Sequence, residues 1–335
     1  MVSRTLSPRP PVYDRPGVSR LRIEPFADQY LDAAGELLAA RHRRHRAVEP
    51  LLPARYEDVT AARAEVEMLW RTDDTPGAVA VENGRVVAYV IGVRKGDDAW
   101  GPNVWVDPAG HAASPSEDLR DVYAAVADHW VAAGREAHYA IVPATDGDLV
   151  DAWQRLGFGH QAAYGIREIS EIGWPEGTRE ARHDDVDSLV ELYPQMGQHH
   201  RASPVFSIRR PRQGTEELRK EFEENLTRDD VGVLVAEQGG RVVGYFQVEP
   251  VETSPRHSGV ARVEGSAFLH VAITEPEVRG RGAGVNLMQA ALAWAAEHGY
   301  DTMTTDWRVT NLLSSRFWPT RGFRPTFFRL HRLIA

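Results

Sequence analysis

The feature that most constrains the fold is a short pattern that occurs twice. Arg85–Tyr89 (RVVAY) in the first half of the chain matches Arg241–Tyr245 (RVVGY) in the second half. Each copy follows an apolar stretch and a pair of turn residues, Asn83–Gly84 in one case and Gly239–Gly240 in the other. Apolar stretches that flank such residues are typical of β-hairpins. The sequence therefore predicts the same hairpin in both halves.

The match continues beyond the hairpins in the same order. Upstream, His45–Ala47 matches His200–Ala202. Downstream, three positions recur with identical spacing: Asp146, Trp153 and Gly157–Phe158 in the first half, and Asn311, Trp318 and Gly322–Phe323 in the second. Several matches in one order are hard to obtain by chance. We therefore interpret the chain as a tandem duplication.

The duplication predicts two domains, at 21–169 and 177–335, joined by a short linker at 170–176. Residues 1–20, which hold several prolines, predict a flexible tail. In each domain a first strand is followed by helical segments, the hairpin, a fourth strand, a long helix, a fifth strand and a short helix. The expected fold class is α/β (α+β), with two tandem domains that each contain a mixed, mostly antiparallel sheet flanked by helices.

Composition limits the function. A length of 335 residues suits two domains, and a net charge of −9 disfavours nucleic acid and anionic membranes as partners. The absence of cysteine excludes disulfide bonds, thiolate metal sites and a cysteine nucleophile. No apolar stretch has the length of a membrane-spanning helix, and the N-terminus lacks an apolar signal core. We expect a cytoplasmic, metal-free monomer, an internal pseudo-dimer.

The run most informative about chemistry is Arg279–Gly284 (RGRGAG), between the apolar run Phe268–Ile273 and a helical pattern that begins at Val285. A strand, a glycine-rich turn and a helix in this order form an anion site. Glycines let the anion approach the backbone closely, and the N–H groups at the helix N-terminus point toward its negative charge. A Walker loop would need a lysine, and a dinucleotide fingerprint would need glycines at another spacing. Neither alternative fits this run.

Residues around the turn extend the pattern: Pro276, Asn311, Ser314, Phe317–Trp318 and Gly322–Phe323. With them, the second half resembles the GNAT superfamily of acyl-CoA-dependent N-acyltransferases over its whole length. The resemblance implies an enzyme that transfers an acyl group directly to an amine, with acetyl-CoA as the expected donor. The expected acceptor is a small-molecule or metabolite amine. A peptide or protein amine, or a non-catalytic acyl-CoA-binding or scaffold protein, are the alternatives.

The resemblance also implies where the cofactor lies. The turn would hold the pyrophosphate of coenzyme A, and the pantetheine arm would pair with the fourth strand. There a backbone N–H near Val271 or Ala272 would polarise the thioester carbonyl. Asn311 would line the cofactor, and Trp318 would pack against it or in the core. The expected cofactor-binding residues are Val271, Ala272, Ile273, Arg279, Gly280, Arg281, Gly282, Ala283, Gly284, Asn311 and Trp318.

Direct transfer requires a base that takes the proton of the amine. The candidates are Glu264 and His270 near the fourth strand and Asp306 at the end of the fifth. Each has a structural alternative. Glu264 would be a solvated charge at the start of a strand, His270 a hydrogen-bonded histidine on a strand, and Asp306 the cap of the following loop.

The acid and the acceptor site are less defined. Trp318 stands where many members of the family place a proton-donating tyrosine, and an indole cannot fill that role, which leaves Tyr245 and Tyr300 as substitutes. A thiolate that leaves unaided is the alternative, since thiol pKa values lie near 8.5. The predicted acceptor wall consists of His199, His200, Arg201 and Phe206. A polar loop between helices is the other interpretation.

The first half lacks the anion turn. When Pro108 is aligned with Pro276, His111–Pro115 occupies the place of Arg279–Gly284, without its glycines. We therefore expect a degenerate copy that does not bind coenzyme A. The basic run Arg41–Arg46 predicts either a contact with an acidic substrate or a solvated helix end.

Overall fold

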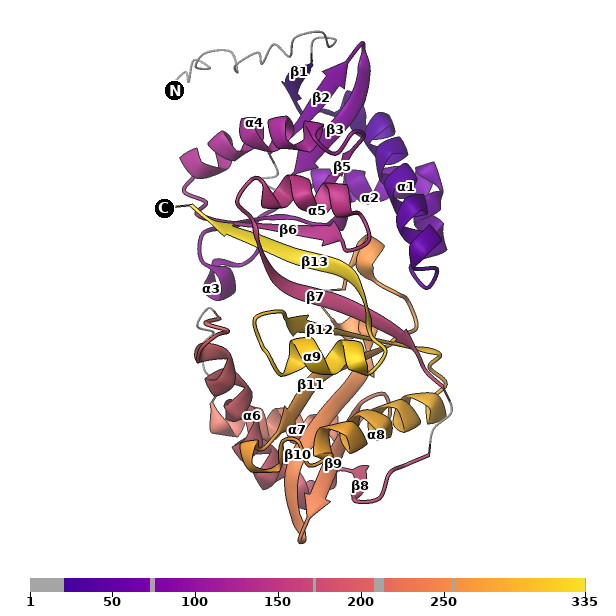
Figure 1. The fold of residues 1–335 in the computed structure, drawn as a ribbon, viewed down its shortest axis with the longest axis vertical. Helices are drawn as coiled ribbons and strands as arrows, with labels where there is room; N and C mark the ends of the chain where they lie inside the picture. Colours follow the sequence, from indigo (N-terminus) through magenta and orange to yellow (C-terminus); the bar gives the residue numbers. More distant parts are fainter. Residues whose placement is uncertain (1–20, 73–75, 171–172, 208–213, 255–256, 335) are drawn as a thin grey trace. The chain divides into compact units, whose positions relative to one another are not determined.

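The computed structural model describes residues 21–72, 76–170, 173–207, 214–254 and 257–334 (Figure 1). The chain forms two compact units. Unit 1 comprises Met1–Pro50, Ala54–Gly159 and Leu330–Ala335, and unit 2 comprises Leu51–Pro53 and His160–Arg329. The tail predicted at 1–20 and part of the predicted linker lie outside the described residues.

Unit 1 contains an antiparallel sheet in the order β1-β2-β3-β5 and a parallel pair, β4 with β6. The strands are β1 (Arg22–Pro25), β2 (Gly77–Glu82), β3 (Arg85–Ile91), β4 (Asn103–Val106), β5 (His111–Ala113) and β6 (Ala137–Pro143). The helices are α1 (Leu31–Val48), α2 (Val59–Trp70), α3 (Asp97–Trp100), α4 (Asp118–Ala132) and α5 (Gly147–Gln154).

The strands of unit 2 follow the order β13-β7-β12-β11-β10-β9-β8, and β11 and β12 are parallel. The strands are β7 (Gly159–Glu168), β8 (Thr178–Glu180), β9 (Gly232–Gln238), β10 (Arg241–Pro250), β11 (Ala267–Thr274), β12 (Thr302–Arg308) and β13 (Arg324–Leu333). The helices are α6 (Val186–Arg201), α7 (Thr215–Asn225), α8 (Ala283–Glu297) and α9 (Ser314–Thr320). The predicted fold class, mixed and mostly antiparallel sheets flanked by helices, is confirmed.

The two predicted hairpins, β2–β3 and β9–β10, share an irregularity. In β3 the register skips Val87, since Val81 pairs with Val86 and Ala80 with Ala88. In β10 it skips Val243, the residue that matches Val87 in the repeat. A β-bulge is a specific local device, so its presence at the same position in both copies supports the duplication.

The compact units do not follow the predicted domain boundaries. Strand β7, expected in the first domain, belongs to unit 2 and pairs with β12 from Thr302 opposite Glu168 onward. The last residues of the chain belong to unit 1, where the Ile334 amide donates to the Glu136 carbonyl. A repeat shows which segments correspond, but strand pairing decides which unit holds them. The duplicated segments 21–169 and 177–335 thus stay a proposal.

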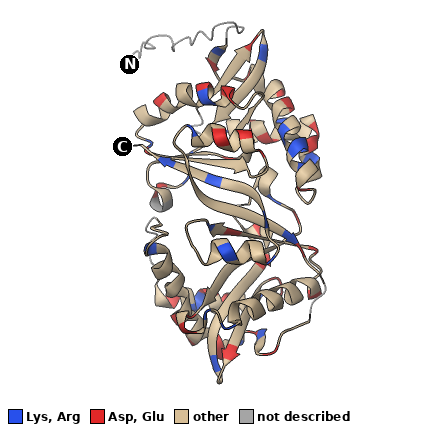
Figure 2. Ribbon diagram, in the orientation of Figure 1, with Lys and Arg blue, Asp and Glu red and all other residues tan. Residues whose placement is uncertain are grey.

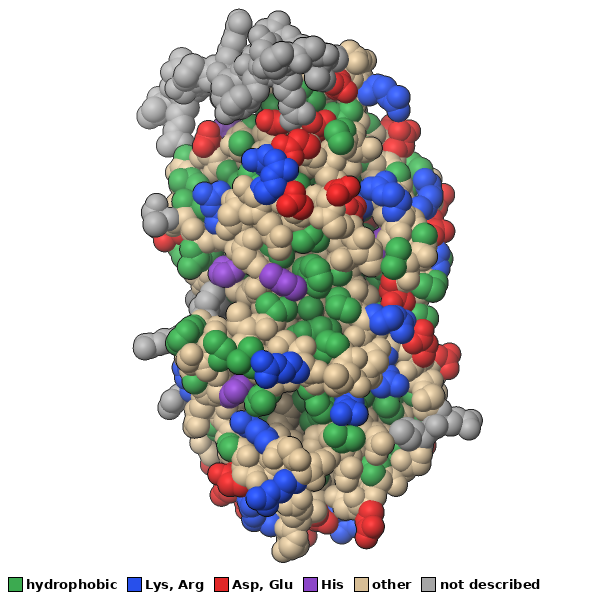
Figure 3. All heavy atoms as spheres, viewed as in Figure 1, with side chains coloured by type: hydrophobic (Ala, Val, Ile, Leu, Met, Phe, Trp, Pro, Cys, Tyr) green, Lys and Arg blue, Asp and Glu red, His purple; other side chains and the backbone are tan. Residues whose placement is uncertain are grey.

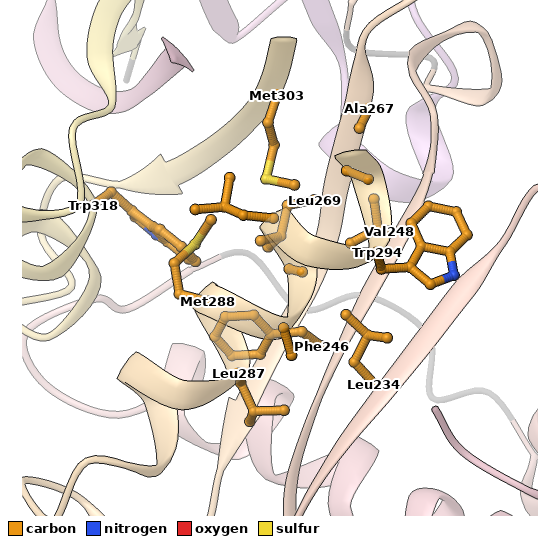
Figure 4. Close-up of a cluster of buried hydrophobic side chains, with 14 of the residues drawn as sticks. Leu234, Phe246, Val248, Ala267, Leu269, Leu287, Met288, Trp294, Met303 and Trp318 are labelled. Atoms are coloured by element: carbon orange, nitrogen blue, oxygen red, sulfur yellow. The ribbon is translucent and has the colours of Figure 1, made fainter. Parts of the chain in front are cut away.

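Two apolar layers cover the sheet of unit 2. On one face, residues such as Leu234, Phe246 and Leu269 pack against α8 (Figure 4). On the other face, Tyr245 and its neighbours pack against α6 and α7. The buried stripe predicted for the long helix is confirmed at Met288, Ala291, Leu292 and Ala295. The sheet of unit 2 is therefore packed by helices on both faces.

A close contact between β9 and α8 gives a stability prediction. A β-carbon at Gly232 would lie 2.6 Å from the ring of Trp294, which is 1% exposed. We expect Gly232→Ala to lower the free energy of unfolding by about 1–3 kcal/mol, because the packed ring has no room to move. Urea denaturation measures the change, with Gly173→Ala as the control. A β-carbon at exposed Gly173 meets no atom within 4 Å, and an equal loss in both variants would contradict the packing argument.

The basic run lies along α1, where Figure 2 shows it as blue turns of the helix. Arg41, His42 and His45 are buried. Arg43 and Arg44 are exposed, and Arg46 pairs with Glu57 at 2.7 Å. A solvated helix end therefore describes only part of Arg41–Arg46, and a contact with an acidic substrate stays a prediction. On the face in Figure 3, acidic and basic side chains are interspersed. Within the described ranges, no helix is both long and apolar enough to cross a membrane.

Candidate functional site

Strands β11 and β12 pair only at their beginnings. Their register joins Ala267 to Met303, Phe268 to Thr304 and Leu269 to Thr305. At the last pair the Thr305 hydroxyl donates to the Leu269 carbonyl at 2.9 Å. Both strands continue further, and within the described residues they form no further pair. The edge of β11 after Leu269 is thus available to another hydrogen-bonding chain.

A β-bulge lies at the point where the strands separate. Gln247 of β10 faces Val271 and Val248 faces Leu269, so His270 has no residue opposite. Bulges bend a strand and redirect a side chain, and they are frequent next to active sites. His270 is accordingly 36% exposed, although both strand neighbours are buried.

The Arg-Gly turn follows β11 and leads into α8. Gly280 and Gly282 have φ of 75° and 96°, a region that favours glycine. A β-carbon at either position would meet no atom within 4 Å, so backbone conformation alone requires these glycines. Gly282 is the N-cap of α8, whose first N–H groups have no partner within the helix. The Arg279 guanidinium donates to the Thr274 carbonyl at 3.2 Å, which ties the exposed turn to β11.

Asn311 organises the end of β12. Its side-chain oxygen accepts hydrogen bonds from the amides of Leu313 at 3.1 Å and Ser314 at 3.4 Å, at the start of α9. The same oxygen lies 3.1 Å from Nε2 of His199 at the end of α6. A carbonyl oxygen only accepts, so His199 donates through Nε2. The structure thus joins a predicted cofactor residue to a predicted acceptor residue.

The other predicted acceptor residues are less defined. His200 and Arg201 are half-buried in the last turn of α6, and Phe206 is 71% exposed with φ of 45°. Phe206 therefore does not form part of a packed wall by itself. Of the predicted acceptor residues, His199 has the clearest connection to the site.

The structure adds a residue that the sequence interpretation missed. Glu249 of β10 lies with Oε1 3.2 Å from Nδ1 of His270. Burial of Glu249 favours its neutral form, but hydrogen bonds from His270, Thr253 and Gln247, with the charge of His270, hold its pKa below the ordinary value. Gln247 and Glu249 sit two positions apart in an otherwise apolar strand, which is the sequence signal that could have pointed to a polar site.

The remaining candidate bases are placed differently. Glu264 is exposed in the loop that precedes β11. Asp306 is half-buried in β12, opposite Tyr164 of β7. Of the three carboxylate or imidazole groups proposed from the sequence, His270 alone is placed at the bulge. Within the described residues, no cluster of three or more His, Asp or Glu side chains could hold a metal ion.

Of the candidate acids, Tyr245 is buried in the core and Tyr300 is half-buried. Tyr245 is fully buried against Phe222, and burial raises its pKa well above the ordinary value. Burial also raises the pKa of Tyr300, which stacks near Trp294. Trp318 is 5% exposed and points into the apolar cluster (Figure 4). Packing in the core, one of its two expected roles, fits this position, and packing against the cofactor stays a prediction.

The corresponding turn of unit 1 corrects the sequence alignment. Ala88 and Gly244 occupy the same position in the repeat. Ala88 pairs with Ala113 in unit 1, and Gly244 pairs with Thr274 in unit 2, so Ala113 corresponds to Thr274. His111–Ala113 is therefore strand β5 and not the replacement for the anion turn. The connection from strand to helix has four residues, Ser114–Glu117, against eight in unit 2. The predicted alignment of Pro108 with Pro276 is wrong, because a short 3-10 helix at Pro108–Gly110 interrupts the strand.

Side chains of unit 1 fill the corresponding positions. Glu117, just before α4, binds Arg120 at 2.7 Å and Arg155 at 2.9 Å. A carboxylate of the chain thus lies at this helix N-terminus, where it is electrostatically favourable. His111 spans the interval between β5 and β6, with Nε2 2.9 Å from the Ile141 carbonyl. Burial, with the charge of Arg41 as the second cause, lowers the pKa of His111 to about 3.

Comparison with known proteins identifies relatives of the second half. A family model described as the Acetyltransferase (GNAT) family matches residues 196–323. An uncharacterized N-acetyltransferase of Archaeoglobus fulgidus is 28% identical over 146 residues, which cover 44% of this chain and 91% of that protein. The residues matched by the family model include α8, the Arg-Gly turn, β11 and β12.

Two solved structures share the fold. A GCN5-related N-acetyltransferase from Sphaerobacter thermophilus has a TM-score of 0.56 at 12% identity and covers 94% of this chain and 96% of its own. A GCN5-related glucosamine N-acetyltransferase region of a fungal multi-domain GH3 β-N-acetylglucosaminidase has a TM-score of 0.54 at 15% identity. That comparison covers 96% of this chain and 39% of the fungal protein. At such identities the likeness concerns the fold.

Proposed function

We propose that this chain is an acyltransferase of the GNAT family, whose model matches residues 196–323, and that its unit 2 transfers an acyl group from an acyl-CoA, acetyl-CoA first, directly to the amine of a small molecule. The observation that carries the proposal is the separation of β11 from β12 immediately before the Arg-Gly turn. The free edge of β11 can pair with a ligand arm that forms hydrogen bonds, and the turn that follows it can bind the phosphate end of the same ligand.

The residues of the turn fit the phosphate end. Gly280 and Gly282 let the backbone present its amides, and Arg279 and Arg281 are exposed cations. Ala283 and Gly284 contribute the first amides of α8. Hydrogen bonds to charged groups contribute about 1.5–3 kcal/mol each, so a few of them support micromolar affinity.

The edge of β11 fits the hydrogen-bonding arm. Val271 and Ile273 are anchored by the core under α6 and α7, while Ala272 packs toward α8. The backbone of this stretch is thereby rigid, as a preorganised donor requires. A thioester supplies the activated acyl group, and an amide near Val271 or Ala272 would bind its carbonyl oxygen.

The acceptor site is proposed beside the bulge. His270 is the proposed base, because it is the exposed imidazole at the point where the strands separate. Glu264 and Asp306 are the alternatives. His199, joined to Asn311, is proposed to line the acceptor side together with His200 and Arg201.

A small-molecule amine is the proposed acceptor. Most amines are cations at neutral pH, and the buried carboxylate of Glu249 beside the bulge favours a cation nearby. The fungal protein of similar fold is described as acting on glucosamine, which is a small-molecule amine. A peptide amine as acceptor would explain the cofactor residues and the base equally well. Binding of acyl-CoA without transfer would explain the cofactor residues but would not need a base.

The test is incubation of the full chain with acetyl-CoA and a panel of amino sugars, polyamines, amino acids and peptides. Thiol release and product mass are followed together. We expect turnover with at least one small amine, and none when that amine is omitted. Transfer to peptides alone would favour the protein-acetyltransferase alternative. Tight acetyl-CoA binding without transfer to any acceptor would favour the scaffold alternative.

A further inference from the structure

We propose that Glu249 is the positioning residue for His270, and that it holds the imidazole so that Nε2 accepts the proton of the acceptor amine. The inference rests on the proposed acyl transfer and assigns a residue to that site. Glu249 does not touch the substrate in this scheme. It acts only through the ring of His270.

The geometry fixes which nitrogen is available. Glu249 Oε1 lies 3.2 Å from Nδ1 of His270, and the two side chains are 11% and 36% exposed. A carboxylate only accepts hydrogen bonds, so Nδ1 carries the proton and Nε2 keeps its lone pair. The β-bulge directs this ring away from the regular ladder. The outer nitrogen is thus the one able to receive a proton.

The carboxylate is itself held in place. Gln247 Nε2 donates to Glu249 Oε2 at 3.3 Å. Phe268 stacks on the imidazole of His270 with ring centroids 5.5 Å apart and an angle of 22°. One side of the pair is therefore packed by protein. Rotation of His270 would break both the stacking and the contact with Glu249.

Other charged or titratable groups surround the pair. Arg228, in the loop after α7, interacts electrostatically with Glu249. His257 packs on Phe268 at 4.9 Å and donates to or accepts from the Ser254 hydroxyl at 3.0 Å. Asp306 lies on the neighbouring strand β12. Glu249 is the carboxylate whose oxygen lies 3.2 Å from the His270 imidazole.

The proton balance is simple. A neutral amine attacks the acyl carbon, the N–C bond forms, and the C–S bond breaks with its electron pair on sulfur. Nε2 of His270 takes the proton that the nitrogen releases, and Glu249 stabilises the imidazolium across Nδ1. The proton then passes to the thiolate or to water. No other reactant is required.

The decisive variant is Glu249→Gln, which keeps the shape of the side chain and removes its charge. We expect the titration of His270, followed by NMR in the protein without ligands, to move to lower pH, since the imidazolium loses its anionic partner. We expect kcat to fall about 10- to 100-fold with little change in the KM for acetyl-CoA. The acidic limb of the pH–rate profile should move to lower pH by the same amount as the NMR value.

Two further variants complete the test. Glu249→Asp should recover part of the activity, because it restores the charge at a longer distance. Glu252→Gln is the control: Glu252 is an exposed carboxylate that accepts a hydrogen bond from the Gly265 amide, and its replacement should leave the His270 titration unchanged. If Glu249→Gln does not fold, the Asp variant and the tautomer of wild-type His270 decide.

The proposal is overturned if NMR finds the proton of neutral His270 on Nε2, or if Glu249→Gln leaves both the titration of His270 and kcat unchanged. A chain that transfers acyl groups to no amine would remove the proposed function, whereas the NMR results would still decide whether Glu249 orients the ring. The two failures are therefore distinguishable.

Discussion

Replacement of Gly282 by valine is expected to weaken coenzyme A binding by at least about a hundredfold and to reduce turnover at low acetyl-CoA concentration equally. Gly282 has φ of 96° and caps α8, and a branched residue avoids this conformation. The turn must then rearrange, and its amides no longer point to one place. Loss of two hydrogen bonds to charged groups, about 1.5–3 kcal/mol each, corresponds to this loss of affinity or more.

Gly239→Val provides the matched control. Gly239 also has a positive φ, of 59°, and a β-carbon there also meets no atom within 4 Å. It lies in the β9–β10 turn, so it shares the backbone strain but not the proposed ligand. Isothermal titration with coenzyme A and thermal unfolding are measured for both variants. Similar losses of stability with a loss of affinity in Gly282→Val alone would support the site.

The outcome that contradicts the site is also clear. If Gly282→Val is folded and binds coenzyme A as tightly as the wild type, the turn does not hold the pyrophosphate. If Gly239→Val loses affinity to the same extent, the effect of both substitutions acts through global stability. In either case the proposal for Arg279–Gly284 would have to be withdrawn.

Local patterns in the sequence predicted much of the architecture. The hairpins follow from turn residues between apolar stretches, and the buried face of α8 follows from the spacing of Met288, Ala291, Leu292 and Ala295. The glycines of the anion turn follow from their need for positive φ, which the structure has at Gly280 and Gly282. In each case the signal lies within a few consecutive residues, where short-range physics decides the conformation.

The contact between Glu249 and His270 could not be predicted in this way. The two residues lie on different strands, and their approach depends on the register between β10 and β11 and on the bulge at His270. A shift by one residue would turn either side chain to the other face of the sheet. Sequence reasoning from one chain does not fix that register, so His270 was found and its partner was not.

The alignment of the two halves failed for a related reason. Pro108 was aligned with Pro276, but the strand pairing shows that Ala113 is the residue that corresponds to Thr274. The 3-10 helix at Pro108–Gly110 inserts residues into the first copy, and an insertion inside a strand is invisible to spacing. The spacing of residues also does not show that β7 belongs to unit 2, because β7 and the strands that it pairs with all have ordinary strand sequences.

A stoichiometry of one coenzyme A per chain is the second large effect that we expect. Unit 1 has four residues between β5 and α4 where unit 2 has eight between β11 and α8. Glu117 places negative charge at that helix start, and His111 hydrogen-bonds across to the Ile141 carbonyl. Phosphate would meet a carboxylate there, and a pantetheine arm would meet a buried side chain. Both conditions oppose a second site.

Isothermal titration of the full chain measures the stoichiometry directly, and Gly282→Val identifies the unit that binds. We expect one site in the wild type and no measurable site in the variant at the same concentrations. Glu117→Ala removes the carboxylate but leaves the short connection, so it should still show one site. Two sites in the wild type, or one site of unchanged affinity in Gly282→Val, would assign binding to unit 1. The expectation that unit 1 does not bind coenzyme A rests more on the short connection at Ser114–Glu117 than on the loss of glycines. That connection would then not prevent binding.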